Sequence, residues 1–351
     1  DKGSIYLTRE VFRFDHCDDG NVRLFIGTKT NNIGYLSFKA HGKFEIPNSL
    51  YVRKERGHYY VSFCYEQGQP DRKLSTNEEH LAFLQGATRE YLEEHTMGVD
   101  RGVAIPVCAG EQTYDFTHSQ KKNMSKADRY IKRLQRKLAR QQKVSNRRAK
   151  TKHRIAVHHA KKANIRNDFA HKTSRLLVDS SAKIIVFEAL RTARMTRRPK
   201  AKQDEQGRFI SNKAKQKAGL NKSILNVGWH VIETYTYYKA YSSSKAVFKI
   251  PAPTTSQECA KCGHTHPDNR KTQALFVCGN CGNTDNADHN ASLVIKKRAI
   301  NLILDTGTVL SGDGVLRTQS DSGRGGNRKT GRAKSSTSSA QRSVKKEKLA
   351  A

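Results

Sequence analysis

The sequence has few acidic residues and no long apolar run. Its 351 residues include 32 Asp and Glu against 65 Lys and Arg, which gives a formal net charge of +33. No apolar stretch approaches the ~20 residues that a membrane-spanning helix needs, and no signal peptide opens the chain. We therefore expect a soluble, cytoplasmic protein with no membrane partner. The chain begins with Asp1 rather than Met, so we also expect that an N-terminal piece is missing.

The excess of basic residues restricts the class of partner. An enzyme of small metabolites gains nothing from such self-repulsion, whereas a polyanion would neutralise the charge and release counterions. An anionic membrane is disfavoured because no amphipathic helix with an aromatic or leucine-rich face accompanies the charge. Residues 121–175 hold 20 Lys and Arg against two Asp, and residues 191–222 hold 11 against two acids. This clustering predicts a nucleic-acid-binding surface.

The distribution of apolar residues predicts an α/β domain preceded by a small β domain. Residues 1–67 contain short aromatic and β-branched segments separated by turns, a pattern typical of a small β-barrel. The rest of the chain is expected to follow in this order: a connector at 68–94, a domain of buried strands and basic helices at 95–254, a cysteine-rich segment at 255–284, a helix at 285–310 and a disordered basic tail at 311–351. Within the second domain, we expect a loop at 191–222 and a helix at 223–240.

Four of the seven cysteines form one cluster: Cys259, Cys262, Cys278 and Cys281. Two Cys-x2-Cys pairs separated by 15 residues match the spacing of a structural zinc site. Gly263 and Gly282 follow the two pairs and allow tight turns. A redox pair or a chance arrangement is the alternative, and this spacing disfavours both. Four thiolates close the coordination shell of zinc, so no position remains for a substrate.

Three acidic residues stand where a carboxylate is costly or unusual. Asp100 interrupts an apolar run, and Glu188 ends the buried strand pattern KIIVFEAL. A carboxylate buried in this way needs a cation or another strong partner. Asp288 opens a helix, where a helix N-cap is the simpler interpretation, and Asp100 alone could be a salt-bridged strand residue. Together, three carboxylates can hold two Mg²⁺ ions ~4 Å apart for in-line displacement at phosphorus.

The order of Asp100, Glu188, the cysteine cluster and Asp288 resembles that of the TnpB proteins of bacterial insertion sequences, relatives of the compact type V CRISPR effectors. The resemblance covers about residues 50–305. It is densest in four segments: NIRNDFAHKTSR (164–175), GLNKSILNVGW (219–229), PTTSQECAKCG (253–263) and CGNCGNTDNADHNAS (278–292). It implies an RNase H-like RuvC domain with an inserted zinc ribbon. Residues 1–67 would then be most of a wedge-like β-barrel, and we expect its N-terminal part and the helical recognition domain of the family to be missing.

The resemblance also implies an activity and its site. Asp100, Glu188 and Asp288 would be the catalytic triad that binds two Mg²⁺ ions, and the four cysteines would bind one structural Zn²⁺. TnpB-like proteins use a guide RNA made from the transposon end and cut double-stranded DNA beside a short flanking motif. The expected function is therefore an RNA-guided, Mg-dependent DNA endonuclease, with guide RNA and double-stranded DNA as partners.

Three other functions remain open from the sequence. A guide-directed DNA-binding protein without cleavage is disfavoured by the acids at all three triad positions. A truncated, inactive transposon remnant is supported by the missing N-terminal region. A zinc-ribbon DNA-binding protein without catalysis would leave the buried acids unexplained. Among single residues, we interpret His289 as a solvated helix-start residue and Trp229 as core, whereas Arg270 is either a nucleic-acid contact or a surface charge.

Overall fold

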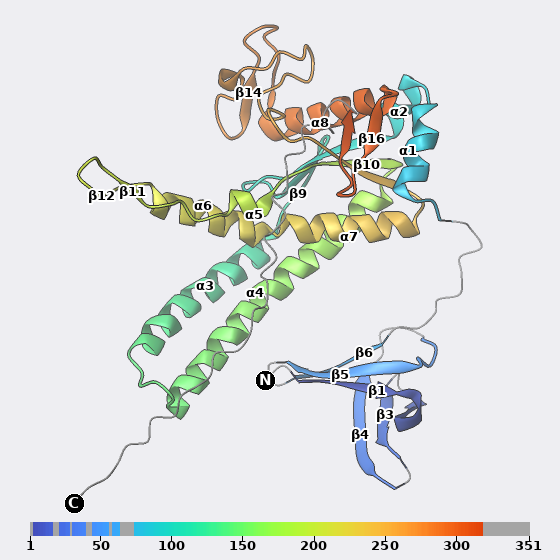
Figure 1. Ribbon diagram of the computed structural model, residues 1–351, viewed down its shortest axis with the longest axis vertical. Coiled ribbons are helices and arrows are strands. Elements are labelled where there is room, and N and C mark those ends of the chain that lie inside the picture. The colour runs from blue at the N-terminus through green and yellow to red at the C-terminus, as the bar shows by residue number, and fades with distance from the viewer. Residues whose placement is uncertain are drawn as a thin grey trace, which may run out of the picture.

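The computed structural model describes residues 3–16, 21–28, 30–39, 44–55, 58–63 and 74–318. Figure 1 shows its arrangement of helices and strands. The described part contains no helix that is long and apolar enough to cross a membrane. Cys17 and Cys64 lie outside the described residues, as do residues 319–351 of the predicted tail.

The N-terminal strands form two antiparallel sheets of three strands each (Figure 1). Their orders are β1-β5-β6 and β2-β3-β4. Apolar side chains from both sheets, among them Leu24 and Leu50, share one core. The predicted closed barrel is therefore wrong for the described residues, because the two sheets bury a common face without a hydrogen-bonded ladder between them. The elements are β1 (Ser4–Thr8), the 3-10 helix η1 (Arg9–Val11), β2 (Phe12–His16), β3 (Asn21–Gly27), β4 (Asn32–Lys39), β5 (Ser49–Glu55) and β6 (His58–Phe63).

A mixed five-stranded sheet lies at the centre of the rest of the chain, in the order β13-β10-β7-β8-β9. Strands β13, β10 and β7 run parallel, whereas β8 is antiparallel to β7 and β9 is antiparallel to β8. The continuous apolar runs of the parallel strands fit burial on both faces. The prediction of a mixed α/β fold is thus confirmed. The strands are β7 (Thr96–Asp100), β8 (Val107–Ala109), β9 (Gln112–Tyr114), β10 (Ile184–Glu188) and β13 (Ala246–Ile250).

Helices cover both faces of this sheet. Because side chains alternate along a strand, Ile185 and Phe187 of β10 pack in a core with α4, α6 and α7. Ile184 and Val186 point the other way, into a core with α1, α2 and α8. The helices are α1 (Asn77–Gln85), α2 (Arg89–His95), α3 (His118–Ala139), α4 (Asn146–Asp179), α5 (Thr192–Met195), α6 (Ala214–Val227), α7 (Trp229–Ser242) and α8 (Ala287–Leu304).

The predicted loop at 191–222 and helix at 223–240 both need correction. The first segment contains α5, the short strands β11 (Lys202–Gln203) and β12 (Phe209–Ile210), and the start of α6. The second is divided at Gly228, whose φ of 79° lies in the left-handed region that favours glycine. The first turns of α6 are polar and basic, so they carry no apolar stripe that would predict a helix.

Two features complete the fold. Helices α3 and α4 pack together as a long hairpin that extends away from the sheet (Figure 1). After α8, strands β16 (Thr308–Leu310) and β17 (Leu316–Thr318) form a second hairpin. The predicted disorder is therefore wrong for residues 311–318. Val315 and Leu316 are buried there, and this burial stabilises a segment whose composition is mostly polar.

Candidate active site and metal centre

Asp100 and Glu188 lie at the same edge of the central sheet. Asp100 is the last residue of β7, and Glu188 is the last residue of β10. The two strands are parallel neighbours, with Phe187 paired to Val99. The two acids therefore end adjacent strands at the same level. Their residues are 9% and 6% exposed, respectively, so both carboxylates are largely removed from water.

Asp288 reaches this edge from a third segment, at the second residue of α8. The N-cap of α8 is Asn286, whose side-chain oxygen accepts from the backbone N–H of Asp288 at 2.9 Å and of His289 at 3.2 Å. The carboxylate of Asp288 is therefore not used as the helix cap. Helix α8 crosses β7 closely at Gly98, where an added Cβ would lie 2.1 Å from the backbone oxygen of Ser292. This close crossing brings the start of α8 to the strand ends.

The carboxylate of Asp100 responds to the charges of the other two acids. Burial raises the pKa of Asp100 to about 7, and the charges of Glu188 and Asp288 contribute to this rise. Burial also raises the pKa of Glu188, although a hydrogen bond donated by Thr255 Oγ1 and nearby arginines oppose the shift. In the described part of the chain, only the cysteine cluster brings three or more ligand atoms within 4.8 Å of one another. The three carboxylates are therefore less tightly gathered than the four sulfurs.

Two arginines neutralise part of this negative charge. Arg270 Nη2 lies 2.9 Å from Asp288 Oδ1, so Arg270 belongs to the carboxylate edge instead of being a plain surface charge. Arg101 is 4% exposed; it donates to the backbone oxygen of Glu188 and pairs with Glu233 at 2.6 Å. Arg101 and Glu233 were not predicted from the sequence. A charged residue directly after Asp100 was the available signal.

The cysteine cluster is compact. All four sulfurs lie within 4.8 Å of one another, with 3.7 Å between Cys259 and Cys281 and 3.5 Å between Cys262 and Cys278. Tetrahedral zinc with Zn–S bonds of ~2.3 Å needs sulfurs ~3.8 Å apart, so the sulfurs fit one zinc ion. Around them lie a 3-10 helix and a short hairpin: η2 (Pro267–Asn269), β14 (Leu275–Val277) and β15 (Thr284–Asn286).

Two glycines and two buried asparagines hold the cysteine pairs in place. Gly263 and Gly282 have φ of 77° and 70°, and each donates its backbone N–H to the first cysteine carbonyl of its pair. The side chain of Asn269 contacts both halves of the ribbon, donating to the carbonyls of Gln257 and His264 and accepting from the N–H of Gly279. Asn290 of α8 accepts from Ala260 N–H at 3.0 Å and donates to Glu258 at 2.8 Å. The asparagines carried no signal in the sequence, because their role depends on tertiary contacts.

The predicted basic surface lies along the α3–α4 hairpin. Much of the charge of α3 is exposed: Lys126, Arg129, Lys132, Arg133, Arg136 and Lys137. Lys162 of α4 is an exception, since it is buried and paired with Asp128 at 2.6 Å. Trp229 is 5% exposed and donates Nε1–H to Gly102, as expected of a core residue. His289 is partly exposed and contacts Asp285 at 2.8 Å.

Comparisons with known proteins give matches along most of the described chain. A family model described as a probable transposase matches residues 62–198, and one described as a Cas12f1-like TNB domain matches residues 229–295. The putative RNA-guided DNA endonuclease InsQ of Escherichia coli K12 is 36% identical over 288 residues, which are 81% of this chain and 64% of that protein. The chain spans less than two thirds of that relative's length.

Two further matches are to Cas12f1 proteins. The endodeoxyribonuclease Cas12f1 of Sulfoacidibacillus thermotolerans is 27% identical over 263 residues, which are 72% of this chain and 53% of that protein. Among solved structures, a cryo-EM structure of a Cas12f1–sgRNA–target DNA complex aligns with a TM-score of 0.40 at 13% identity. That alignment covers 84% of this chain and 67% of the Cas12f1 chain.

Proposed function

Because this chain belongs to the TnpB family, we propose that it is an RNA-guided DNA endonuclease of a transposable element that cuts phosphodiester bonds with two Mg²⁺ ions. One observation carries the proposal. Asp100, Glu188 and Asp288 come from segments nearly 200 residues apart, yet they meet closely enough for two of the charges to raise the pKa of the third. A buried acid whose pKa is raised by neighbouring acids is costly to the fold, and sites of this kind are often functional.

The fold supports an RNase H-like RuvC nuclease domain. Strands β7 and β10 are adjacent and parallel, so the carboxyl edge of the sheet gathers acids from two distant segments. Helix α8 then supplies the third acid across β7. In this proposal, the zinc ribbon at 255–284 is inserted between β13 and α8 of the nuclease domain. The two sheets before residue 64 form its wedge-like domain.

The residues at the carboxylate edge suit divalent cations with oxygen ligands. Asp100, Glu188 and Asp288 would hold two ions, and Mg²⁺ is favoured because it prefers carboxylate oxygens. When bound, such ions lower the pKa of an attacking water and stabilise the leaving oxygen. The protein itself keeps the carboxylates in position: Thr255 donates to Glu188, and Arg270 pairs with Asp288. The basic α3–α4 hairpin would hold the phosphodiester backbone.

The cysteine cluster would hold one structural Zn²⁺. Four sulfurs at near-tetrahedral spacing leave no open position. The ribbon also contributes Arg270 to the carboxylate edge, so zinc would support the nuclease site indirectly, by fixing the segment that carries this arginine.

The proposed partners are a guide RNA from the transposon end and a double-stranded DNA target. The name of the E. coli relative supports this assignment, and the positive charge of the chain fits two polyanionic ligands. Guide pairing would supply sequence specificity, while the protein would read backbone shape and a short flanking motif.

Plasmid cleavage tests the proposal. The protein is co-expressed with the flanking end of its element and incubated in Mg²⁺ with a library that carries a guide-matched target beside randomised flanks. We expect guide-dependent cutting that is lost in Glu188→Gln and retained in Asp268→Asn, which removes an exposed ribbon carboxylate. Undiminished cutting by Glu188→Gln would refute the catalytic assignment. Guide-dependent binding without cutting by the wild type would instead indicate a guided DNA-binding protein.

A further inference from the structure

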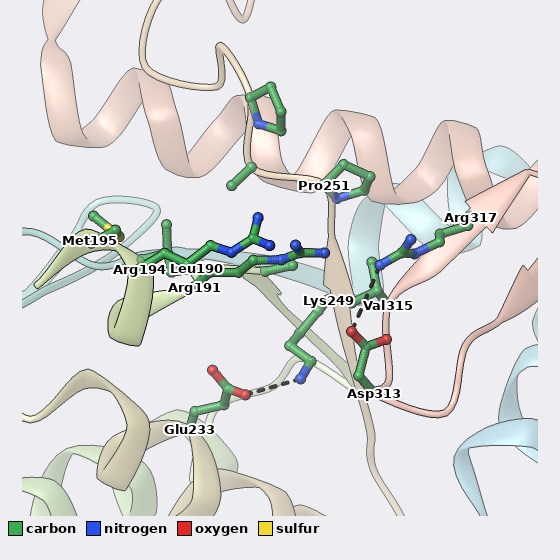
Figure 2. Close-up of a pocket in the computed structure, with 13 residues that line it drawn as sticks. Leu190, Arg191, Arg194, Met195, Glu233, Lys249, Pro251, Asp313, Val315 and Arg317 are labelled. Atoms are coloured by element: carbon green, nitrogen blue, oxygen red, sulfur yellow. Dashed lines mark hydrogen bonds and ion pairs between the residues drawn. The ribbon is translucent and has the colours of Figure 1, made fainter. Parts of the chain in front are cut away.

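A cavity of about 740 Å³ opens where β10 ends (Figure 2). Its wall begins with Ala189, the residue directly after Glu188. Helix α5, residues 251–253 after β13, and the β16–β17 hairpin close the other sides. Four cationic side chains line this space, which we call the arginine cavity: Arg191, Arg194, Lys249 and Arg317.

The acidic side chains of the arginine cavity already have cationic partners. Glu233 pairs with Lys249 at 3.2 Å and also with buried Arg101, and Asp313 lies 3.7 Å from Arg317. Figure 2 shows these two acids beside Lys249 and Arg317, so neither carboxylate is left to repel an anion. The other two cations then determine which ligand the cavity attracts.

The other two cations are arginines without an acidic partner. Neither Arg191 nor Arg194 forms an ion pair with an acid of the described chain, and Figure 2 shows both side chains extending into the cavity toward Lys249. Two guanidinium groups directed into one concave space suit phosphate, because each can donate two parallel hydrogen bonds to its oxygens. The cavity is therefore an anion site by charge and by shape.

The cavity is too large for a phosphate group alone. Its volume falls within the ~300–1,000 Å³ of typical small-ligand sites. Leu190, Met195, Pro251 and Val315 add apolar surface beside the cations. A phosphate with an attached sugar and base would fill both parts, with the base against the apolar wall.

The wall opposite α5 is fixed before any ligand binds. Lys249 N–H donates to Gly314 at 2.9 Å, which joins the β16–β17 hairpin to β13. On the other side, Ala189 N–H donates to Ile250 at 2.8 Å. Walls held by backbone hydrogen bonds lose little conformational entropy when a ligand binds. The cavity is thus a preformed site at the end of the strand that carries Glu188.

We propose that the arginine cavity is a nucleotide subsite that holds one nucleotide of the DNA strand being cut, next to the scissile phosphate. Arg191 and Arg194 bind its phosphate, and the apolar wall receives its base. This inference rests on the proposed nuclease function, since it places the subsite beside Glu188. It assigns to α5 and the β16–β17 hairpin the role of positioning the strand at the carboxylate edge.

Binding measurements test the subsite without relying on cleavage or on a guide. The full chain is titrated into a fluorescent single-stranded DNA in Ca²⁺, and the dissociation constant is measured at several salt concentrations. The Arg191→Gln/Arg194→Gln variant should bind about tenfold more weakly, and its salt slope should fall by about 0.7 for each lost phosphate contact. The matched control is Arg197→Gln/Lys200→Gln, which removes two exposed charges of the same segment outside the cavity. It should change affinity much less.

A double-substitution cycle, with one change in the protein and one in the DNA, identifies the phosphate that Arg191 and Arg194 bind. One methylphosphonate linkage at a time neutralises a phosphate along the oligonucleotide. At one position, the substitution should weaken wild-type binding but leave the double arginine variant unchanged, because the same contact is already lost. The subsite would be refuted if the Arg191/Arg194 and Arg197/Lys200 double variants lost equal affinity for DNA. It would also be refuted if the effects of the protein and DNA changes were additive at every phosphate position. If the protein does not cut DNA but one phosphate position still shows this coupling with the two arginines, the result counts only against the proposed nuclease function.

Discussion

The cysteine cluster and the carboxylate edge are both candidate metal sites, but they are built in opposite ways. The four sulfurs come from two Cys-x2-Cys pairs and lie within 4.8 Å of one another. The three carboxylates come from two strands and a helix, and their oxygens do not all lie within 4.8 Å of one another in the described part of the chain. The first site is closed by local backbone geometry, whereas the second depends on long-range packing.

The difference has an electrostatic consequence. A shell of four thiolates directs all its ligands to one ion and leaves no position for another molecule. At the carboxylate edge, burial and neighbouring charge raise the pKa of Asp100 to about 7, and Arg270 is in direct contact with Asp288. A structural ion therefore suits the first site, while exchangeable ions and a phosphate ester suit the second.

The largest expected effect is the loss of the zinc site. Cys278→Ser should remove the zinc, because three thiolates no longer close the shell, and the ribbon at 255–284 should unfold locally. Structural zinc contributes about 10–16 kcal/mol of binding free energy in zinc-finger peptides, more than the few buried side chains of this ribbon can replace. Metal analysis and limited proteolysis measure both changes.

The control for this prediction is another buried thiol. Cys108 lies in β8, outside the cluster. Cys108→Ser should retain one zinc per chain, even if packing around β8 suffers. If Cys278→Ser retained a full equivalent of zinc with a protected ribbon, the closed character of the cysteine cluster would be refuted.

The carboxylate edge should respond to pH in the opposite sense to an ordinary ion pair. The folded-state pKa of Asp100 is raised from 3.8 to about 7, so the folded state binds a proton more tightly than the unfolded state. Without Mg²⁺, the free energy of unfolding should therefore fall as pH rises from about 4 to about 7. Asp100→Asn should remove this slope and stabilise the protein at pH 8 by at most about 4 kcal/mol.

Asp128→Asn should change the free energy of unfolding in the opposite direction. Burial opposes ionisation of Asp128, but hydrogen bonds from Lys162 and Lys222 outweigh it and lower its pKa. This carboxylate stabilises the fold above its unfolded pKa, so its variant should lose stability at neutral pH. Urea unfolding at a series of pH values measures both variants. An unchanged pH slope in Asp100→Asn would contradict the raised pKa of Asp100. Equal stabilisation of wild type and Asp100→Asn by Mg²⁺ would contradict its proposed role as a metal ligand.

More of the cysteine cluster than of the carboxylate edge could be predicted from the sequence. Cysteine spacing predicts the cluster directly, because each Cys-x2-Cys pair is a short continuous stretch of sequence. Asp100 and Glu188 could be selected because each stands in an apolar strand pattern. Their shared edge depends on the register of β7 with β10, and the contribution of Arg270 depends on how the ribbon packs against α8. Neither relation is visible in a local pattern.

The fold shows the same limit. The buried strands of the central sheet were predictable because short continuous apolar runs are typical of buried strands. The division at Gly228 was not, because glycine within a helical pattern is compatible with either continuation or a break. The barrel prediction failed for a related reason: alternation predicts strands, but the sequence does not determine which strand edges pair.

A smaller effect is expected from the contact that brings α8 to β7. In Gly98→Ala, the new Cβ would meet the backbone of α8 at 2.1 Å from Ser292 O, so the helix must move away. Overpacking typically costs about 1–3 kcal/mol, and a clash with backbone places this variant at the upper end of that range. Displacement of Asp288 should also weaken stabilisation by Mg²⁺ while zinc content stays constant. Thermal unfolding with and without Mg²⁺ tests whether the carboxylate edge alone depends on this packing.

Gly219→Ala is the matched glycine control. Gly219 lies inside α6 with no atom within 4 Å of an added Cβ. Alanine is favoured over glycine inside a helix by about 1 kcal/mol, so this variant should be slightly stabilised. Equal behaviour of the two variants, or an unchanged response to Mg²⁺ in Gly98→Ala, would show that the crossing of α8 over β7 does not position Asp288.

The smallest expected effect concerns the ion pair between Arg270 of the ribbon and Asp288 of the carboxylate edge. The Asp288 side chain is 5% exposed and that of Arg270 is 22% exposed, so the ion pair lies between an exposed pair of about 0–1 kcal/mol and a buried one of about 3–5 kcal/mol. Arg270→Gln should therefore cost about 2 kcal/mol in Mg²⁺-free urea unfolding, and Arg270→Lys less, because the charge remains. Mg²⁺ should restore most of the loss, since a cation at Asp288 replaces the missing guanidinium. A loss that Mg²⁺ leaves unchanged would mean that Arg270 stabilises only the ribbon and does not compensate the charge of Asp288.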